Sequence, residues 1–102
     1  MTKVISVLAI ATLSFNMNIA IAADAAAGKV RAATCAACHG VNGISANDMW
    51  PNLAGQKNGY LIAQMKAFRD GIRKNPVMSP MAASLTDTDI ANLAAYYSGL
   101  GG

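Results

Sequence analysis

Both cysteines of this chain and its only histidine lie within five residues, 35–39, which read Cys-Ala-Ala-Cys-His. Positions i, i+3 and i+4 of a helix share one face, so Cys35, Cys38 and His39 can all point at one planar group. Two thiols at this spacing can add to the vinyl groups of a haem as thioethers, while the imidazole reaches its iron. The run therefore predicts one covalently bound haem c per chain, with His39 as an iron ligand.

Three other uses of these residues agree less well with the sequence. A thioredoxin-like redox pair needs a βαβ pattern around its Cys-x-x-Cys, and no strand-like run surrounds residues 35–38. A tetrahedral zinc site needs four ligands, and two cysteines with one histidine leave it one ligand short. A disulfide between Cys35 and Cys38 would be strained on a single helical turn. Haem attachment is the interpretation that uses all three side chains.

The first 22 residues have the pattern of an export signal. Lys3 supplies a positive charge, residues 4–13 are almost wholly apolar, and Ala20-Ile21-Ala22 is the small-x-small pattern that a signal peptidase cuts after. The apolar stretch is shorter than the roughly 20 residues that a membrane-spanning helix needs. We therefore expect residues 1–22 to be a cleaved signal peptide and the protein to reach the periplasm. An uncleaved membrane anchor is the alternative.

Residues 23–102 would then form a single domain of 80 residues. Chains this short seldom stabilise themselves by apolar burial alone, so a tethered haem would also supply part of the core. Loss of Lys3 lowers the formal charge from +3 to +2, and two ionised haem propionates would bring the holoprotein close to neutrality. This charge gives no support for nucleic-acid binding.

The domain is predicted to contain three main helices. Asp24 can cap a first helix over residues 25–38, which would place the cysteines and the histidine at its C-terminal end. A second helix is predicted over residues 58–69, with Gly71 as its stop signal. A third is predicted from residue 86 to about 99, because Thr-x-x-Asp at its start resembles a capping box.

The segments between these helices are predicted to be loops. The first, residues 40–55, is rich in Gly, Asn and Ser and has room for one short helical turn. In the second, residues 76–80, two prolines are expected to break the chain. The inward face of the last helix is expected to carry Ile90, Leu93, Ala94 and Tyr97. No run typical of a strand is present, so the expected fold class is all-α.

Five blocks of the sequence resemble the class I c-type cytochromes, most closely the small monohaem periplasmic type that is similar to one half of the dihaem cytochromes. The blocks are 35–40 (CAACHG), 50–56 (WPNLAGQ), 60–71, 78–81 (MSPM) and 85–97. The resemblance implies a class I cytochrome c fold, with three main helices and short helical turns around one covalently bound haem. Gly28 and Tyr97 are expected to meet where the first and last helices cross.

The resemblance also implies a second iron ligand, a methionine in the loop before the last helix. Its distance from the start of that helix assigns the ligand to Met78, with Met81 as the alternative. Met65 lies on an apolar helix stripe, where methionine usually fills the core, and Met49 lies on the loop directly after the histidine. Histidine and methionine together fill both axial positions and raise the reduction potential. This pair implies one-electron transfer.

Further roles around the haem follow from the same resemblance. The carbonyl of Pro51 is expected to accept a hydrogen bond from the His39 ring, which would fix the imidazole and raise its basicity. Trp50, Tyr60 and Gln64 are candidates for lining the haem or for hydrogen bonds to its propionates. Aromatic residues in so small a core need no such role.

Basic residues concentrate in one segment of the expected mature chain: Lys57, Lys66, Arg69, Arg73 and Lys74. They could form a basic rim that steers an acidic redox partner toward the haem edge. A solvated helix face balanced by Asp70 is the alternative.

Together these features predict a periplasmic one-electron carrier between a donor complex and a terminal acceptor, not an enzyme. A haem protein with an open axial site, which binds or reduces a small ligand, is the alternative. A docked subunit of a dehydrogenase would share the carrier chemistry. The expected partners are redox proteins, with no nucleic acid and no stable membrane insertion after the leader is removed. The expected state is a monomer or a weak oligomer.

Overall fold

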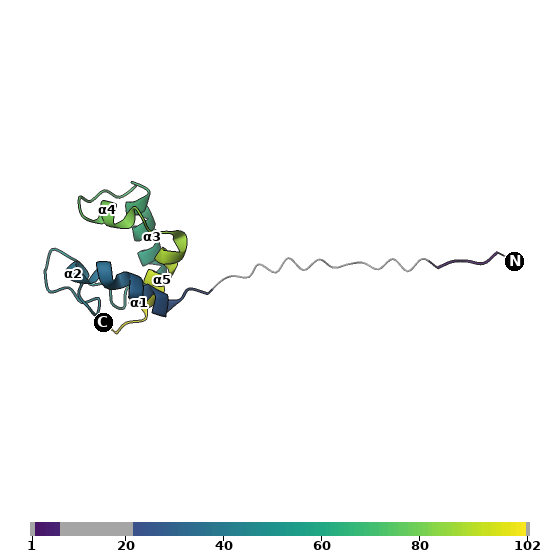
Figure 1. The fold of residues 1–102 in the computed structure, drawn as a ribbon, viewed down its shortest axis with the longest axis horizontal. Helices are drawn as coiled ribbons and strands as arrows, with labels where there is room; N and C mark the ends of the chain where they lie inside the picture. Colours follow the sequence, from purple (N-terminus) through teal and green to yellow (C-terminus); the bar gives the residue numbers. More distant parts are fainter. Residues whose placement is uncertain (1, 7–21, 102) are drawn as a thin grey trace.

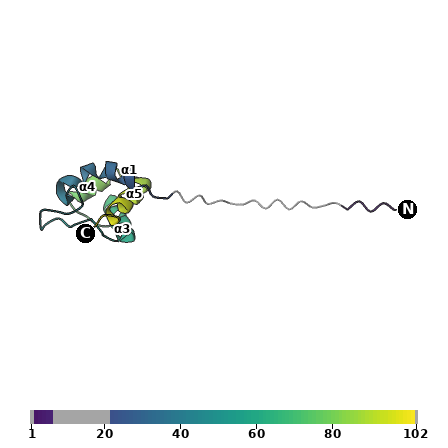
Figure 2. The same ribbon diagram turned by 90° about the horizontal axis from the view of Figure 1, so that it is seen from below.

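The structure, a computed structural model, describes residues 2–6 and 22–101. Every regular element in these described residues is helical, which confirms the all-α fold (Figure 1). The elements are α1 (Ala25–Arg31), the short 3-10 turn η1 (Ala32–Thr34), α2 (Ala36–His39), α3 (Asn58–Arg69), α4 (Met78–Ala82) and α5 (Asp87–Ser98). Seen from the perpendicular direction, α5 lies between α1 and α3 and packs against both (Figure 2).

The predicted signal peptide falls largely on residues 7–21, which lie outside the described residues. Cleavage after Ala22 therefore stays a prediction. Among the residues that are described, no helix has the length and apolar character needed to cross a bilayer.

The first predicted helix, residues 25–38, is divided into α1, η1 and α2, so the expectation of one continuous helix is wrong. The hydroxyl of Thr34 donates to the carbonyl of Arg31 at 3.3 Å, the acceptor that the Cys35 N–H would use in a continuous α-helix. The Cys35 N–H instead donates to the carbonyl of Ala32 at 2.9 Å, which is the tighter 3-10 pattern. The haem-binding run therefore begins on a separate helical turn.

Side-chain caps fix the starts of α1 and α5, as predicted. Asp24 Oδ1 accepts from the N–H groups of Ala26 and Ala27 at 3.0 and 3.1 Å. Thr86 and Asp89 form a reciprocal capping box, with both hydrogen bonds at 3.0 Å. The hydrogen bond from the Thr86 N–H lowers the pKa of Asp89. Both helices thus begin where their cap residues place them.

The segment 76–80 is not a loop: it contains the start of helix α4 at Met78. Asn75 is the physical reason, because its Oδ1 accepts from the N–H groups of Val77 and Met78, each at 2.9 Å. Pro76 follows at a position where a helix start leaves the backbone N–H unpaired anyway, so proline is tolerated. The Asn-Pro pair therefore starts a helix where two prolines had indicated a break.

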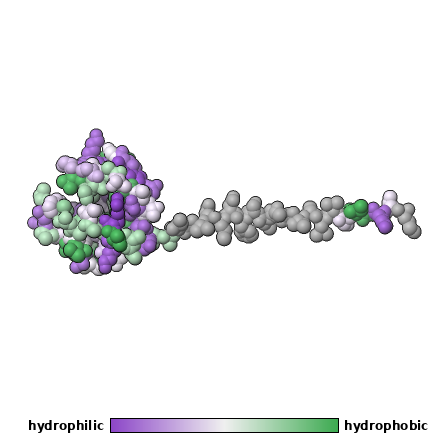
Figure 3. All heavy atoms as spheres, viewed as in Figure 1, coloured by the Kyte–Doolittle hydropathy of each residue, from purple (hydrophilic) through white to green (hydrophobic). Residues whose placement is uncertain are grey.

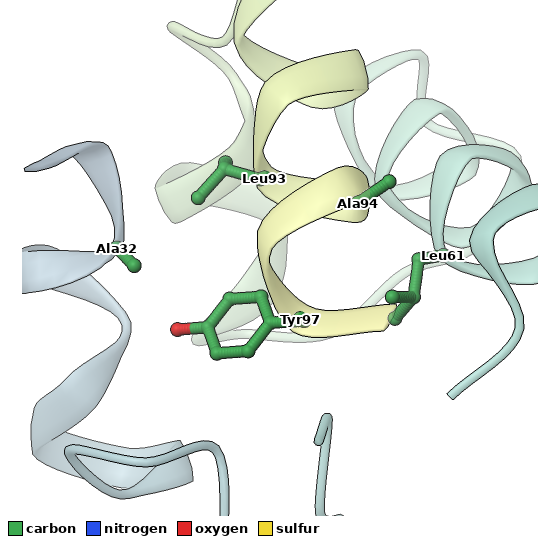
Figure 4. Close-up of a cluster of buried hydrophobic side chains, with 5 residues drawn as sticks. All are labelled: Ala32, Leu61, Leu93, Ala94 and Tyr97. Atoms are coloured by element: carbon green, nitrogen blue, oxygen red, sulfur yellow. The ribbon is translucent and has the colours of Figure 1, made fainter. Parts of the chain in front are cut away.

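Helix α5 provides half of the buried hydrophobic residues in the described part of the chain. Its four predicted inward residues, Ile90, Leu93, Ala94 and Tyr97, are all buried. Hydrophobic side chains also reach the surface in separate patches among hydrophilic ones (Figure 3). Figure 4 shows Leu93 and Tyr97 directed toward Ala32, while Ala94 faces the other side of α5. The α5 side chains thus join the haem-binding segment to α3 in one core.

Gly28 allows α1 to approach α5 closely, but its neighbours are not the predicted ones. A Cβ at Gly28 would overlap the backbone carbonyl of Asn92 and lie 3.0 Å from the Cβ of Tyr96. Tyr97 lies one position further on, which turns it by about 100° around the helix. It therefore packs in the cluster with Ala32. The expected Gly28–Tyr97 meeting is a Gly28–Asn92 contact.

We expect Gly28→Ala to lower the free energy of unfolding by about 3 kcal/mol, since the added methyl group forces α1 away from α5. Thermal unfolding of the holoprotein, followed by circular dichroism, measures this loss. Gly59→Ala is the matched control, because Gly59 is also helical and a Cβ there meets no atom within 4 Å. The control should be neutral or stabilising by up to about 1 kcal/mol. Equal losses in both variants would contradict this account of α1–α5 packing.

Candidate haem site

The haem-binding run occupies one turn of helix. The backbone N–H groups of Cys38 and His39 both donate to the carbonyl of Cys35, at 3.2 and 2.9 Å. Both thiols are free and half-buried, so no disulfide joins them. Gly40 ends the turn at φ +88°, where a Cβ would overlap the carbonyl of Ile44. The cysteines and histidine are thereby held on a single, sharply terminated turn.

His39 is buried, with 7% of its surface exposed. Its Nδ1 lies 2.8 Å from the carbonyl oxygen of Pro51, which is the contact that the resemblance implied. A carbonyl oxygen only accepts, so Nδ1 carries the proton and Nε2 keeps its lone pair. A histidine in this tautomer can bind a metal through Nε2 while the second nitrogen fixes the ring.

The loop that carries Pro51 is itself anchored to the core. The N–H groups of Leu53 and Ala54 both donate to the carbonyl of Gly43, at 2.8 and 3.0 Å. The next N–H, that of Gly55, donates to the carbonyl of Tyr97 in α5 at 2.9 Å. The orientation of His39 therefore depends on backbone hydrogen bonds that reach the central helix.

The methionines differ in their surroundings. Met65 packs against the hydrophobic core, as predicted for a core-filling residue. Met78 is half-buried at the first residue of α4, whereas Met81 is 42% exposed and Met49 is 83% exposed. Figures 1 and 2 place α4 at the same end of the domain as α2. The assignment of the second iron ligand to Met78 stays a prediction.

The other predicted site residues lie on the loop after His39 and on α3. Trp50 and Tyr60 are exposed. Gln64 Oε1 accepts from Arg73 Nη1 at 2.8 Å, so its acceptor is engaged by a neighbouring side chain. Roles for these three in lining the haem or binding its propionates stay predictions.

The donor set and the apolar surface fit a c-type haem. Two free thiols and a histidine with an available Nε2 share one turn, which is the chemistry that thioether attachment and iron ligation need. Large apolar side chains on the loop after His39, on α3 and around α4 are between 41% and 51% exposed: Ile44, Trp50, Tyr60, Val77 and Met81. A flat apolar group can cover surface of this kind.

Arg69 joins the end of α3 to the start of α5. Its Nε lies 2.9 Å from Asp70 Oδ1, and its Nη1 lies 2.7 Å from Asp87 Oδ1 and 3.3 Å from the carbonyl of Leu85. Hydrogen bonds from the guanidinium lower the pKa values of Asp70 and Asp87, and the two carboxylates raise that of Arg69. This cluster fixes the segment that leaves α4.

The expectation of a five-residue basic rim is wrong for one of its members, Arg69, whose charge is balanced locally, while the guanidinium group of Arg73 is engaged by neutral neighbours. Arg69 is bound to Asp70 and Asp87, which agrees with the alternative of a locally balanced helix face. Arg73 stacks over the Phe68 ring, with the guanidinium carbon 4.5 Å from its centroid. Both guanidinium groups are thus engaged within the domain.

Comparison with known proteins agrees with this geometry. The cytochrome c family matches residues 25–100. The chain is 51% identical over 80 residues to cytochrome c-554(548) of Halomonas halodenitrificans, covering 76% of this chain and 96% of that protein. It is 46% identical over 77 residues to cytochrome c4 of Pseudomonas aeruginosa, covering 76% of this chain but 38% of the relative.

A solved cytochrome c4 structure from Acidithiobacillus ferrooxidans has a similar fold, with a TM-score of 0.72 and 36% identity, over 76% of this chain and 50% of that one. The chain thus spans nearly all of one relative but half or less of the cytochrome c4 proteins. These matches show that the chain belongs to the cytochrome c family. It is a class I cytochrome domain, an electron-transfer protein, and binds one c-type haem covalently through Cys35 and Cys38.

Sequence reasoning missed two residues that support the site. Asn75 starts α4, and the Asn75-Pro76 dipeptide is the signal that could have found it, since asparagine before proline is typical of a helix start. Asp87 falls within the predicted last helix, and the sequence assigns it no separate role. Its partner Arg69 is 18 positions away, and no local pattern indicates a contact over that distance.

The acidic residues around Arg69 should make stability depend on pH. The folded pKa of Asp87 lies below the value of about 3.9 for an unfolded aspartate. Its stabilising effect is therefore complete above that pH and is lost as the pH falls through the folded pKa. When the pH is lowered from about 7 to about 3, we expect the melting temperature of Asp87→Asn to fall by less than that of wild type.

Thermal melts of the two holoproteins at both pH values measure this difference, and protonation of other groups affects both proteins alike. Asp48→Asn is the control, since Asp48 is exposed and forms no ion pair in the described part of the chain. A pH dependence for Asp87→Asn equal to that of wild type would contradict the role of the Arg69 cluster.

Proposed function

We propose that this chain is a periplasmic one-electron carrier whose haem iron has His39 and Met78 as its axial ligands. It shuttles electrons between a donor complex and a terminal acceptor, both of them redox proteins. The observation that carries the proposal is the 2.8 Å contact between His39 Nδ1 and the Pro51 carbonyl, which leaves Nε2 for iron. The family membership supports the same function.

A bound haem supplies an iron that alternates between its ferric and ferrous states, at a potential that histidine and methionine ligands raise. The chain's own residues would keep the haem and its ligands in one geometry. Cys35 and Cys38 would anchor the macrocycle to the helical turn, and His39 keeps its tautomer because the Pro51 carbonyl accepts a hydrogen bond from the Nδ1–H group. A fixed ligand set in both oxidation states keeps the reorganisation on electron transfer small.

Met78 completes the ligand set in this proposal. A neutral thioether on the second side would fill the remaining axial position, so a small molecule could reach the iron only when the methionine leaves it. Partial burial favours Met78 over Met81, because a ligand to iron must turn inward and Met81 is 42% exposed. The closed pair favours a carrier over a protein that binds or reduces a small ligand.

Export is the remaining part of the proposal. The apolar leader with its small-x-small site is expected to be cut after Ala22. The mature holoprotein would then consist of residues 23–102 and one haem. Mass spectrometry of the purified holoprotein tests this composition.

Replacing the two methionines separately tests the ligand assignment. In the Met78→Leu holoprotein we expect loss of the weak far-red ferric band that marks sulfur bound to iron, together with rapid CO binding by the ferrous form. Met81→Leu is the matched control, because it removes a thioether one helical turn away and should keep the wild-type spectrum. The reverse pattern would assign the ligand to Met81. A high-spin wild-type spectrum with rapid CO binding would overturn the carrier function.

A further inference from the structure

We propose that Asn75 is a positioning residue, which holds Met78 against the iron and governs how often the methionine leaves it. The inference rests on the proposed ligation by Met78. It assigns a role in iron ligation to a side chain that does not itself bind the haem. Asn75 acts through the backbone of α4.

Asn75 closes the turn that contains Met78 with four hydrogen bonds. Its Oδ1 accepts from the N–H groups of Val77 and Met78, each at 2.9 Å. Its own N–H donates to Ser79 Oγ at 3.0 Å, and its carbonyl accepts from the Ser79 N–H at 3.0 Å. Met78 therefore sits inside a closed set of contacts between Asn75 and Ser79.

The segment before Asn75 is fixed to the end of α3. The N–H groups of Ile72 and Arg73 both donate to the carbonyl of Ala67, at 2.9 and 3.0 Å. The Arg73 side chain stacks over Phe68 and donates to Gln64. The segment that leads to Asn75 is therefore held against α3, and Asn75 in turn holds the start of α4.

Helix α4 depends on this support because it has only five residues. So short a helix has little stability of its own, and its first turn frays most readily. Met78 is the first residue of that turn, and Ala82 is the only residue of α4 that is fully buried. Loss of the cap should therefore make the first turn of α4, which contains Met78, more mobile while the rest of the domain stays folded.

Imidazole capture by the ferric holoprotein measures this effect. At high imidazole concentration the binding rate is limited by departure of the methionine from iron. Removal of a helix cap should make Asn75→Ala bind imidazole about fivefold faster than wild type. Asn75→Asp keeps an oxygen acceptor at the same position and should restore a rate close to that of wild type.

Asn47→Ala is the matched control. Asn47 Oδ1 accepts from the Met49 N–H at 2.8 Å, which is the same kind of local turn in the loop after His39. This variant should bind imidazole at the wild-type rate, even if its thermal stability falls as much as that of Asn75→Ala. If Asn75→Ala does not retain haem, Ser79→Ala opens the same turn from its other side and should also speed capture.

Equal capture rates in the Asn75→Ala and Asn47→Ala variants would overturn the role of Asn75 while leaving ligation by Met78 intact. A wild-type ferric spectrum without the far-red sulfur band would overturn the ligation itself, and the inference with it. The two failures are distinguishable because the second is seen before any variant is made.

Discussion

The hydrogen bond between His39 Nδ1 and the Pro51 carbonyl is the contact on which the rest of the site depends. It fixes the proton of the imidazole on Nδ1 and so leaves Nε2 as the nitrogen that is available to an iron. It also joins the turn that carries the two cysteines to the loop after it, and that loop is bonded to the Tyr97 carbonyl of α5. One 2.8 Å contact therefore links the ligand, its loop and the central helix.

The two proposed iron ligands, His39 and Met78, are held by different means. The His39 side is a covalently tethered turn whose glycine stop and carbonyl partner leave little freedom. The Met78 side is a five-residue helix held by Asn75 at its start and by the Arg69 contact with the Leu85 carbonyl after its end. We therefore expect methionine, not histidine, to be the ligand that exchanges first when the protein is stressed.

The sequence predicted the features that arise from local patterns or from the family resemblance. The bounds of α3, the capping box at Thr86 and the Pro51 contact belong to this group. The break before α2 was missed because it depends on a hydrogen bond from the Thr34 hydroxyl to the Arg31 carbonyl. The sequence does not indicate which carbonyl this hydroxyl binds. The ion pair between Arg69 and Asp87 was missed because it joins helices that are distant in sequence.

Proton NMR of the ferrous holoprotein, carrying methionine labelled with carbon-13 at its methyl group, tests the closed axial pair most directly. A methyl group bound to iron lies over the haem ring and is shifted far upfield by the ring current. We predict one such signal among the methionines of residues 23–102, and it is the signal that Met78→Leu removes. An upfield signal that survives this substitution, or a spectrum without one, would contradict the account.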